Sequence, residues 1–171
     1  MRRTRFEADV CPVARTVDLL GDWWTPLVLR ELLLGQDRFA RIQERLDIPR
    51  AVLAARLRRL EAEGLVSRVR YEQHPPRDAY QLTDKGRATG DVIMAMWRYG
   101  RDWLAGEDSV VEPYDKHSGA PVRPRVIDET TGRPIELAAV RRRLQPASPG
   151  TDTDTDTDPR TDPRPDQGAR P

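Results

Sequence analysis

The most constraining feature of the sequence is a leucine-spaced segment followed directly by two short alternating segments. Residues 49–63 carry leucines at the spacing of one helical face. Those leucines are Leu53, Leu57 and Leu60. Gly64 ends this predicted helix, and residues 65–71 then alternate apolar and basic side chains, as a half-exposed strand does. Residues 79–82 return as a second strand. A helix that leads into a two-stranded hairpin predicts a mainly α, α+β domain.

Three further helices are predicted before the leucine-spaced one. The first spans residues 12–20, because proline at the first helical position sacrifices no hydrogen bond, and Gly21 ends it. The second spans residues 24–34 and is apolar on nearly every side, which predicts that it is the buried centre of the domain. The third is short and spans residues 39–46.

A final helix is predicted from its capping residue, Thr83, to about Leu104. Its apolar side chains are more numerous than a small domain can cover, so they imply a partner chain. They are Val92, Ile93, Met96, Trp97, Trp103 and Leu104.

Composition separates the chain into three parts. Five of the 15 prolines lie in residues 1–105, the expected folded domain, and ten lie in the remainder. Residues 106–145 contain short apolar pieces and predict a small appendage. Residues 146–171 are rich in Thr, Asp and Pro without a large apolar side chain, so they are expected to be disordered.

Several function classes are excluded by what the sequence lacks. No stretch approaches the roughly 18 apolar residues of a membrane span, and no apolar signal core is present, so a cytoplasmic location is expected. Cys11 is the one cysteine, which excludes an internal disulfide framework and a multi-cysteine metal site. No catalytic triad, paired carboxylates or glycine-rich phosphate loop is found, so we expect neither an enzyme nor a cofactor.

Positive charge is concentrated around the leucine-spaced helix. Residues 38–70 hold nine arginines against four acidic residues. Opposite the leucines, this helix presents small alanines between arginines, which suits close approach to a polyanion. The alternative is a solvated helical face made of good helix formers.

The order of these pieces resembles the HxlR-type winged helix-turn-helix transcriptional regulators over about residues 10–104. The resemblance rests on Cys11-Pro12-Val13, Gly21-Asp22-Trp23-Trp24, Leu29 to Leu34 with Gly35, Arg38-Phe39, Leu53-(3)-Leu57-(2)-Leu60-Glu61-(2)-Gly64-Leu65-Val66, Pro75-Pro76-Arg77, Tyr80-Gln81-Leu82-Thr83-(2)-Gly86 and Trp103.

The resemblance implies a homodimer that joins through its first and last helices and binds a pseudo-palindromic double-stranded operator. The helix at about 49–63 would enter the major groove, and the wing at about 65–82 would lie on the backbone. Base contacts would come from Arg50, Ala51, Val52, Ala54, Ala55 and Arg58, and phosphate contacts from Arg38, Arg41, Arg56, Arg59 and Arg77. The interface would include Val13, Val17, Val92, Ile93, Met96, Trp97 and Trp103. For Arg56, whose angle lies near the leucine face, pairing within the domain stays an alternative.

Two family features depend on cysteine. Some members sense oxidants with a cysteine at the position of Cys11, which makes Cys11 a candidate redox sensor; the alternative is a small buried side chain at the dimer interface. Related regulators also carry a zinc-ribbon-like extension. Here residues 117–119 and 129–134 resemble its two turns without the cysteines, so we predict a degenerate ribbon without metal.

The predicted function is therefore a sequence-specific DNA-binding regulator, expected to repress and open to control by an effector or by redox state. The effector cannot be named from the sequence. The alternative is a winged-helix module that binds protein without specific DNA binding.

Overall fold

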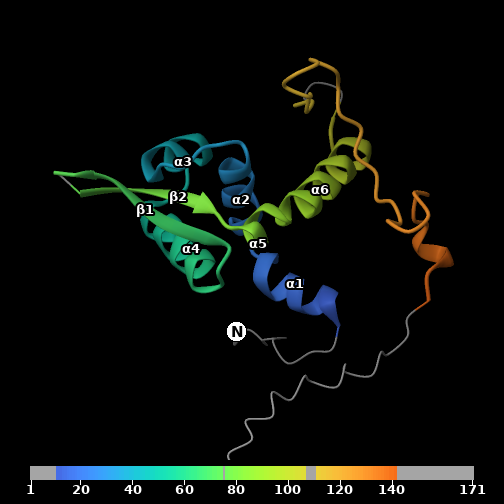
Figure 1. Ribbon diagram of the computed structural model, residues 1–171, viewed down its shortest axis with the longest axis horizontal. Coiled ribbons are helices and arrows are strands. Elements are labelled where there is room, and N and C mark those ends of the chain that lie inside the picture. The colour runs from blue at the N-terminus through green and yellow to red at the C-terminus, as the bar shows by residue number, and fades with distance from the viewer. Residues whose placement is uncertain (1–10, 75, 107–110, 142–171) are drawn as a thin grey trace, which may run out of the picture. The chain divides into compact units, whose positions relative to one another are not determined.

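The computed structural model describes residues 11–74, 76–106 and 111–141. Figure 1 shows a group of helices from which a long two-stranded hairpin projects. In chain order the elements are α1 (Pro12–Leu20), α2 (Thr25–Leu33), α3 (Phe39–Leu46), α4 (Arg50–Ala62), β1 (Val66–Gln73), β2 (Pro76–Leu82), α5 (Asp84–Arg87) and α6 (Thr89–Trp103). The mainly helical α+β class predicted from the sequence is confirmed.

The helix ends follow local backbone chemistry. Pro12 occupies the first turn of α1, and the N–H of Gly21 closes the helix on the carbonyl of Val17. The sharp turn between α3 and α4 depends on Asp47, which takes the left-handed conformation at φ 48°. Pro49 is extended and precedes the first turn of α4. These two residues set the turn of the helix-turn-helix.

The prediction of one continuous last helix is wrong, because the chain forms two helices there, α5 and α6, which are separated at Ala88. The Oγ1 of Thr83 caps α5 by accepting the N–H of Gly86, as predicted. The hydroxyl of Thr89 then donates to the carbonyl of Gly86 at 2.6 Å, a side-chain bond that competes with the helical ladder. Gly86 packs so closely on Leu65 that a Cβ there would lie 2.1 Å from the Leu65 carbonyl oxygen.

The hairpin is antiparallel and longer than the sequence pattern indicated. It pairs Val66 with Leu82 at its base, and the register shifts between Arg70 and Glu72. The connection before α3 also joins the hairpin edge, since the N–H of Tyr80 donates to the carbonyl of Asp37 at 2.7 Å. The hairpin is therefore fastened to α3 as well as to the end of α4.

One apolar core joins these elements. It is built from buried side chains of every helix from α1 to α4 and from the start of β1. The members are Leu20, Val28, Leu29, Leu32, Ile42, Ile48, Leu53, Leu57, Leu60, Leu65 and Val66. As predicted, α2 contributes centrally, although Leu34 at its end is exposed.

Residues 111–134 form two similar turns. The Asp115 carboxylate accepts the N–H groups of His117 and Ser118, and Asp128 does the same for Thr130 and Thr131. Each turn ends in a bridge to a proline, Tyr114 with Pro121 and Ile127 with Pro134. Aspartate side chains thus hold together the two turns that resemble those of a zinc ribbon but lack its cysteines. Residues 135–141 belong to a separate unit with a short 3-10 turn at Leu137–Ala139. The predicted tail at 146–171 lies outside the described residues.

Candidate nucleic-acid interface

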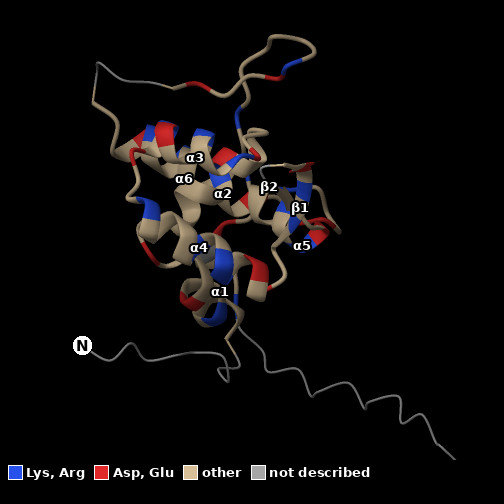
Figure 2. Ribbon diagram, turned by 90° about the vertical axis from the view of Figure 1, so that its left-hand side faces the viewer, with Lys and Arg blue, Asp and Glu red and all other residues tan. Residues whose placement is uncertain are grey.

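Helix α4 has one buried face and one exposed face. Leu53, Leu57 and Leu60 are at most 1% exposed and hold the helix on the core. On the other side, the residues predicted to contact bases are exposed or half-buried. Arg50, Ala51, Ala55 and Arg58 are exposed, and Val52 and Ala54 are half-buried. Figure 2 shows the basic segments along α4 and β1.

The two arginines of this exposed face differ in their surroundings. The guanidinium of Arg50 lies 5.0 Å from the centre of the Phe39 ring, which fixes the start of α4 against α3. Arg58 has no ion pair and no side-chain hydrogen bond within the described part of the chain. Its charge is therefore available to an outside anion.

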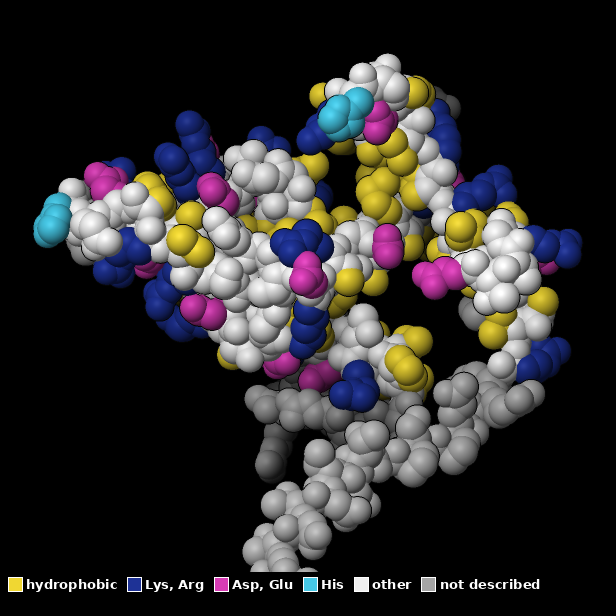
Figure 3. Space-filling model, in the orientation of Figure 1, with side chains coloured by type: hydrophobic (Ala, Val, Ile, Leu, Met, Phe, Trp, Pro, Cys, Tyr) yellow, Lys and Arg dark blue, Asp and Glu magenta, His cyan; other side chains and the backbone are white. Residues whose placement is uncertain are grey.

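The wing carries arginines that are paired only at the surface. Arg70 lies 3.1 Å from Asp78, Arg77 lies 3.3 Å from Glu72, and all four side chains are accessible to solvent. Exposed pairs of this kind are weak, so the arginines can exchange their acidic partners for phosphate. Figure 3 shows basic and acidic side chains along the hairpin. Sequence reasoning named Arg77 alone, although the alternation of basic residues in β1 also signalled Arg68 and Arg70.

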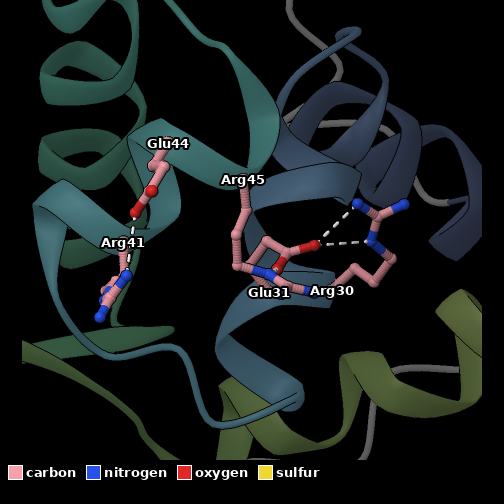
Figure 4. Close-up of polar contacts among 5 residues, drawn as sticks. All are labelled: Arg30, Glu31, Arg41, Glu44 and Arg45. Atoms are coloured by element: carbon pink, nitrogen blue, oxygen red, sulfur yellow. Dashed lines mark hydrogen bonds and ion pairs between the residues drawn. The ribbon is translucent and has the colours of Figure 1, made fainter.

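Arg38 and Arg41 lie at the start of α3. The Arg38 guanidinium stacks 4.7 Å from the centre of the Tyr71 ring on the wing. Arg41 pairs with Glu44 at 3.0 Å, and both side chains are about two-thirds exposed (67% and 69%) (Figure 4). Arg38 therefore joins the start of α3 to the wing, and Arg41 adds an exposed positive charge on α3.

Arg56 and Arg59 are engaged within the domain. The Nε of Arg56 lies 3.0 Å from Oδ1 of Asp22, in the connection between α1 and α2. The Nη2 of Arg59 donates to the backbone carbonyl of Asp18 on α1 at 2.6 Å. The sequence left pairing within the domain open as an alternative for Arg56. The structure contains such a pair, between Arg56 and Asp22.

A buried carboxylate, which sequence reasoning missed, joins α2 to α3 (Figure 4). Glu31 is 1% exposed and accepts hydrogen bonds from Arg45 and Arg30. Burial raises the pKa of the Glu31 carboxyl, but the hydrogen bonds from Arg45 and Arg30 outweigh it and hold the pKa below its ordinary value. The one available signal was an acid and an arginine side by side in the middle of a mostly apolar helix.

The predicted interface residues form exposed apolar surfaces on α1 and α6. Val13, Val17, Met96 and Trp103 are between 50% and 76% exposed, and Val92 is 37% exposed. Ile93 and Trp97 are half-buried. Trp97 donates its indole N–H to the carbonyl of Val111 at 2.9 Å. Figure 3 shows apolar side chains gathered over α6.

Cys11 is half-buried at the N-cap of α1. Among the described residues, no three His, Cys, Asp or Glu side chains are grouped so that they could hold a metal ion. In the same part of the chain, no helix is long and apolar enough to cross a membrane.

A short turn between α3 and α4, an exposed basic face on α4 and an adjoining two-stranded wing define the class of winged helix-turn-helix proteins. Residues 19–108 match the family described as HxlR-like helix-turn-helix, and the chain belongs to that family. The family prediction and the expected fold are confirmed. The relatives are transcriptional regulators, not enzymes, as the sequence also predicted.

Named relatives agree. An uncharacterised HTH-type transcriptional regulator of Synechocystis, sll1512, is 42% identical over 99 residues, covering 57% of this chain and 73% of its own. Another from Mycobacterium tuberculosis, Rv3095, is 36% identical over 132 residues, covering 77% of this chain and 82% of its own.

Solved structures resemble this one as well. PA1607, a candidate transcription factor, superposes with a TM-score of 0.75 at 35% identity, covering 83% of this chain and all (100%) of its own. The reduced form of HypR, a redox regulator, superposes with a TM-score of 0.51 at 32% identity, covering 54% of this chain and 92% of its own.

Proposed function

We propose that this transcriptional regulator acts as a homodimer that binds a specific double-stranded DNA sequence. The observation that carries the proposal is the exposed face of α4, where Arg58 lies without an acidic partner in the described chain between small alanines. Small side chains let the helix enter a major groove, and arginine recognises guanine through two hydrogen bonds. The wing then lies along the neighbouring phosphates.

The proposed contacts divide by position. Base edges are assigned to the exposed side of α4: Arg50, Ala51, Val52, Ala54, Ala55 and Arg58. Phosphates are assigned to Arg38, Arg41 and Arg77, which form exposed or aromatic-stacked cations around that helix. Arg56 and Arg59 were predicted to contact phosphate too, but their contacts within the domain support another role, which is argued below.

Dimerisation is supported by the apolar side chains that α1 and α6 leave in water. A surface of this kind is unusual on a monomer, and a second copy would bury it. The interface is assigned to Val13, Val17, Val92, Ile93, Met96, Trp97 and Trp103. A two-fold dimer presents two copies of α4, which matches a pseudo-palindromic operator.

We further propose that the protein represses transcription and that it acts in the cytoplasm, where the DNA lies. We also propose that Cys11 makes it responsive to redox state. HypR, whose structure resembles this one, is a redox regulator, which supports Cys11 as a candidate sensor. Because the chain has one cysteine, a disulfide there would need the other subunit or a small thiol.

The test is selection of duplexes from a random library by the unaltered protein, followed by anisotropy titration of the selected duplex and of an unrelated one. Arg58→Glu is expected to abolish preferential binding. Arg123→Glu is the control, because Arg123 is also an exposed arginine but lies on the 111–134 segment, outside the proposed DNA-binding surface. Selection of no sequence, or an unchanged Arg58→Glu protein, would instead favour a protein-binding module.

A further inference from the structure

We propose that Arg56 and Arg59 are positioning residues: they fix the orientation of the recognition helix α4 relative to α1 and to the connection between α1 and α2, and they do not contact phosphate. This inference rests on the proposed function, because it concerns how α4 is presented to DNA. It assigns to both arginines a role different from the one that the family resemblance implied.

The two contacts lie on one flank of α4. At 100° per residue, positions 56 and 59 lie beside each other, between the leucine face and the exposed face. Arg56 meets the Asp22 carboxylate at 3.0 Å, and Arg59 donates to the Asp18 carbonyl at 2.6 Å. The Arg59 bond places the end of α1 next to α4, and Figure 2 shows the two helices near each other. Because the contacts are one turn apart, they restrain both the rotation and the tilt of the helix.

Asp22 is itself rigidly held. Its carboxylate accepts the N–H groups of Trp24 and Thr25, both at 2.9 Å, and the hydroxyl of Thr25. The Asp22 side chain is 10% exposed and that of Arg56 is 28% exposed. Burial raises the pKa of Asp22, but these hydrogen bonds and the Arg56 charge outweigh it, so the carboxyl stays ionised at neutral pH. Arg56 therefore pairs with an anion that is fixed to the start of α2.

The arrangement connects two surfaces of the molecule. The same helix α1 turns Val13 and Val17 outward, where the second copy is proposed to pack. A helix that reads bases must be held to within about 0.5 Å of its productive position by its supporting contacts. The Arg59 contact ties α4 directly to α1, the proposed dimer helix, and the Arg56 contact ties α4 to the connection that follows α1. The two recognition helices are therefore oriented through α1 and the start of α2.

Salt dependence separates a positioning residue from a phosphate contact. Each phosphate neutralised by a protein adds about 0.9 to the slope of log K against log salt. We therefore compare Arg56→Gln and Arg59→Gln with Arg41→Gln, whose residue is assigned to phosphate. A further variant, Asp22→Asn, distinguishes the two roles. It removes the negative charge that pairs with Arg56, while its amide oxygen can still accept the hydrogen bonds from the N–H groups of Trp24 and Thr25.

The expected result is a loss of affinity for the selected duplex of about three- to thirty-fold in Arg56→Gln, Arg59→Gln and Asp22→Asn, with an unchanged salt slope. Arg41→Gln should lower the slope by about 0.9. The Asp22→Asn, Arg56→Gln double variant should lose no more than the larger single loss, because both remove the same contact.

Two DNA-binding results would overturn the proposal: a slope reduced by about 0.9 in Arg56→Gln, or tighter DNA binding by Asp22→Asn, as simple charge removal predicts. Amide hydrogen exchange of the free protein is a second test that needs no DNA. Arg56→Gln should speed the exchange of the backbone amides of α4. Unchanged exchange would refute the claim that the Arg56–Asp22 contact holds the helix. If the unaltered protein binds no duplex, the proposed function fails, and hydrogen exchange alone decides whether the tie exists.

Discussion

Glu31 of α2 and Arg45 of α3 form a hydrogen-bonded ion pair, with the Arg45 Nε 2.5 Å from Oε2 of a carboxylate that is 1% exposed. Glu31→Gln keeps the shape of the side chain but removes the charge, so both arginines lose a charged acceptor. We expect a loss of about 1.5–3 kcal/mol in the free energy of unfolding. Urea titration followed by circular dichroism measures it, with Glu44→Gln, which breaks an exposed pair, as the control expected to change little.

The same carboxylate predicts a pH dependence. The pKa of Glu31 in the folded chain lies below its ordinary value of 4.5, so the unfolded chain binds the proton more readily. The stabilisation by Glu31 is therefore present above about pH 4.5 and lost as the pH falls through the folded pKa. Unfolding titrations at pH 7 and pH 3.5 should show the difference between the unaltered protein and Glu31→Gln shrinking at the lower pH. A difference that grew on acidification would refute the assignment.

Two glycines should respond in opposite ways to alanine. A methyl group at Gly86 would meet the Leu65 carbonyl, so Gly86→Ala is expected to cost at least about 1–3 kcal/mol and to disturb the hairpin base. At Gly100, within α6, a methyl group meets nothing within 4 Å. Gly100→Ala should stabilise the helix of the monomer by about 0.5–1 kcal/mol, so it is measured at concentrations below dimerisation. Thermal unfolding of both variants checks the pair, and equal effects would contradict the packing at Gly86.

Dimerisation predicts a concentration-dependent mass. Met96 is 50% exposed on α6, and a charge placed there would be buried without a partner in the dimer. Met96→Glu should therefore sediment as a monomer at concentrations where the unaltered protein is a dimer. Val126→Glu is the matched control, because Val126 is 51% exposed and belongs to the 111–134 segment, not to α1 or α6. A dimer that tolerates Met96→Glu would place the interface elsewhere.

Local signals in the sequence were enough for the elements and their order. The bounds of α3 match the prediction because Phe39, Ile42 and Leu46 have helical spacing and Asp47 permits the left-handed turn. The break at Ala88 was missed, since it depends on how closely Gly86 approaches Leu65, which only the folded chain defines.

For the interface, the spacing of leucines in α4 determined which side chains face outward. It did not reveal which arginines are already engaged. Arg56 meets Asp22 and Arg45 meets Glu31 only because α2, α3 and α4 pack together. The helical angle of Arg56 left pairing within the domain open but could not name its partner, because pairs between elements leave no periodic pattern in a sequence.

The most direct test of the central claim is hydroxyl-radical footprinting of the selected duplex with the unaltered protein. A homodimer with two α4 helices in successive major grooves predicts two protected segments about 10 base pairs apart on one face of the duplex. The Arg58→Gln protein should lose that protection at the same concentration. A single protected segment, or equal protection along the whole duplex, would contradict the claim that this chain reads a two-fold operator through α4.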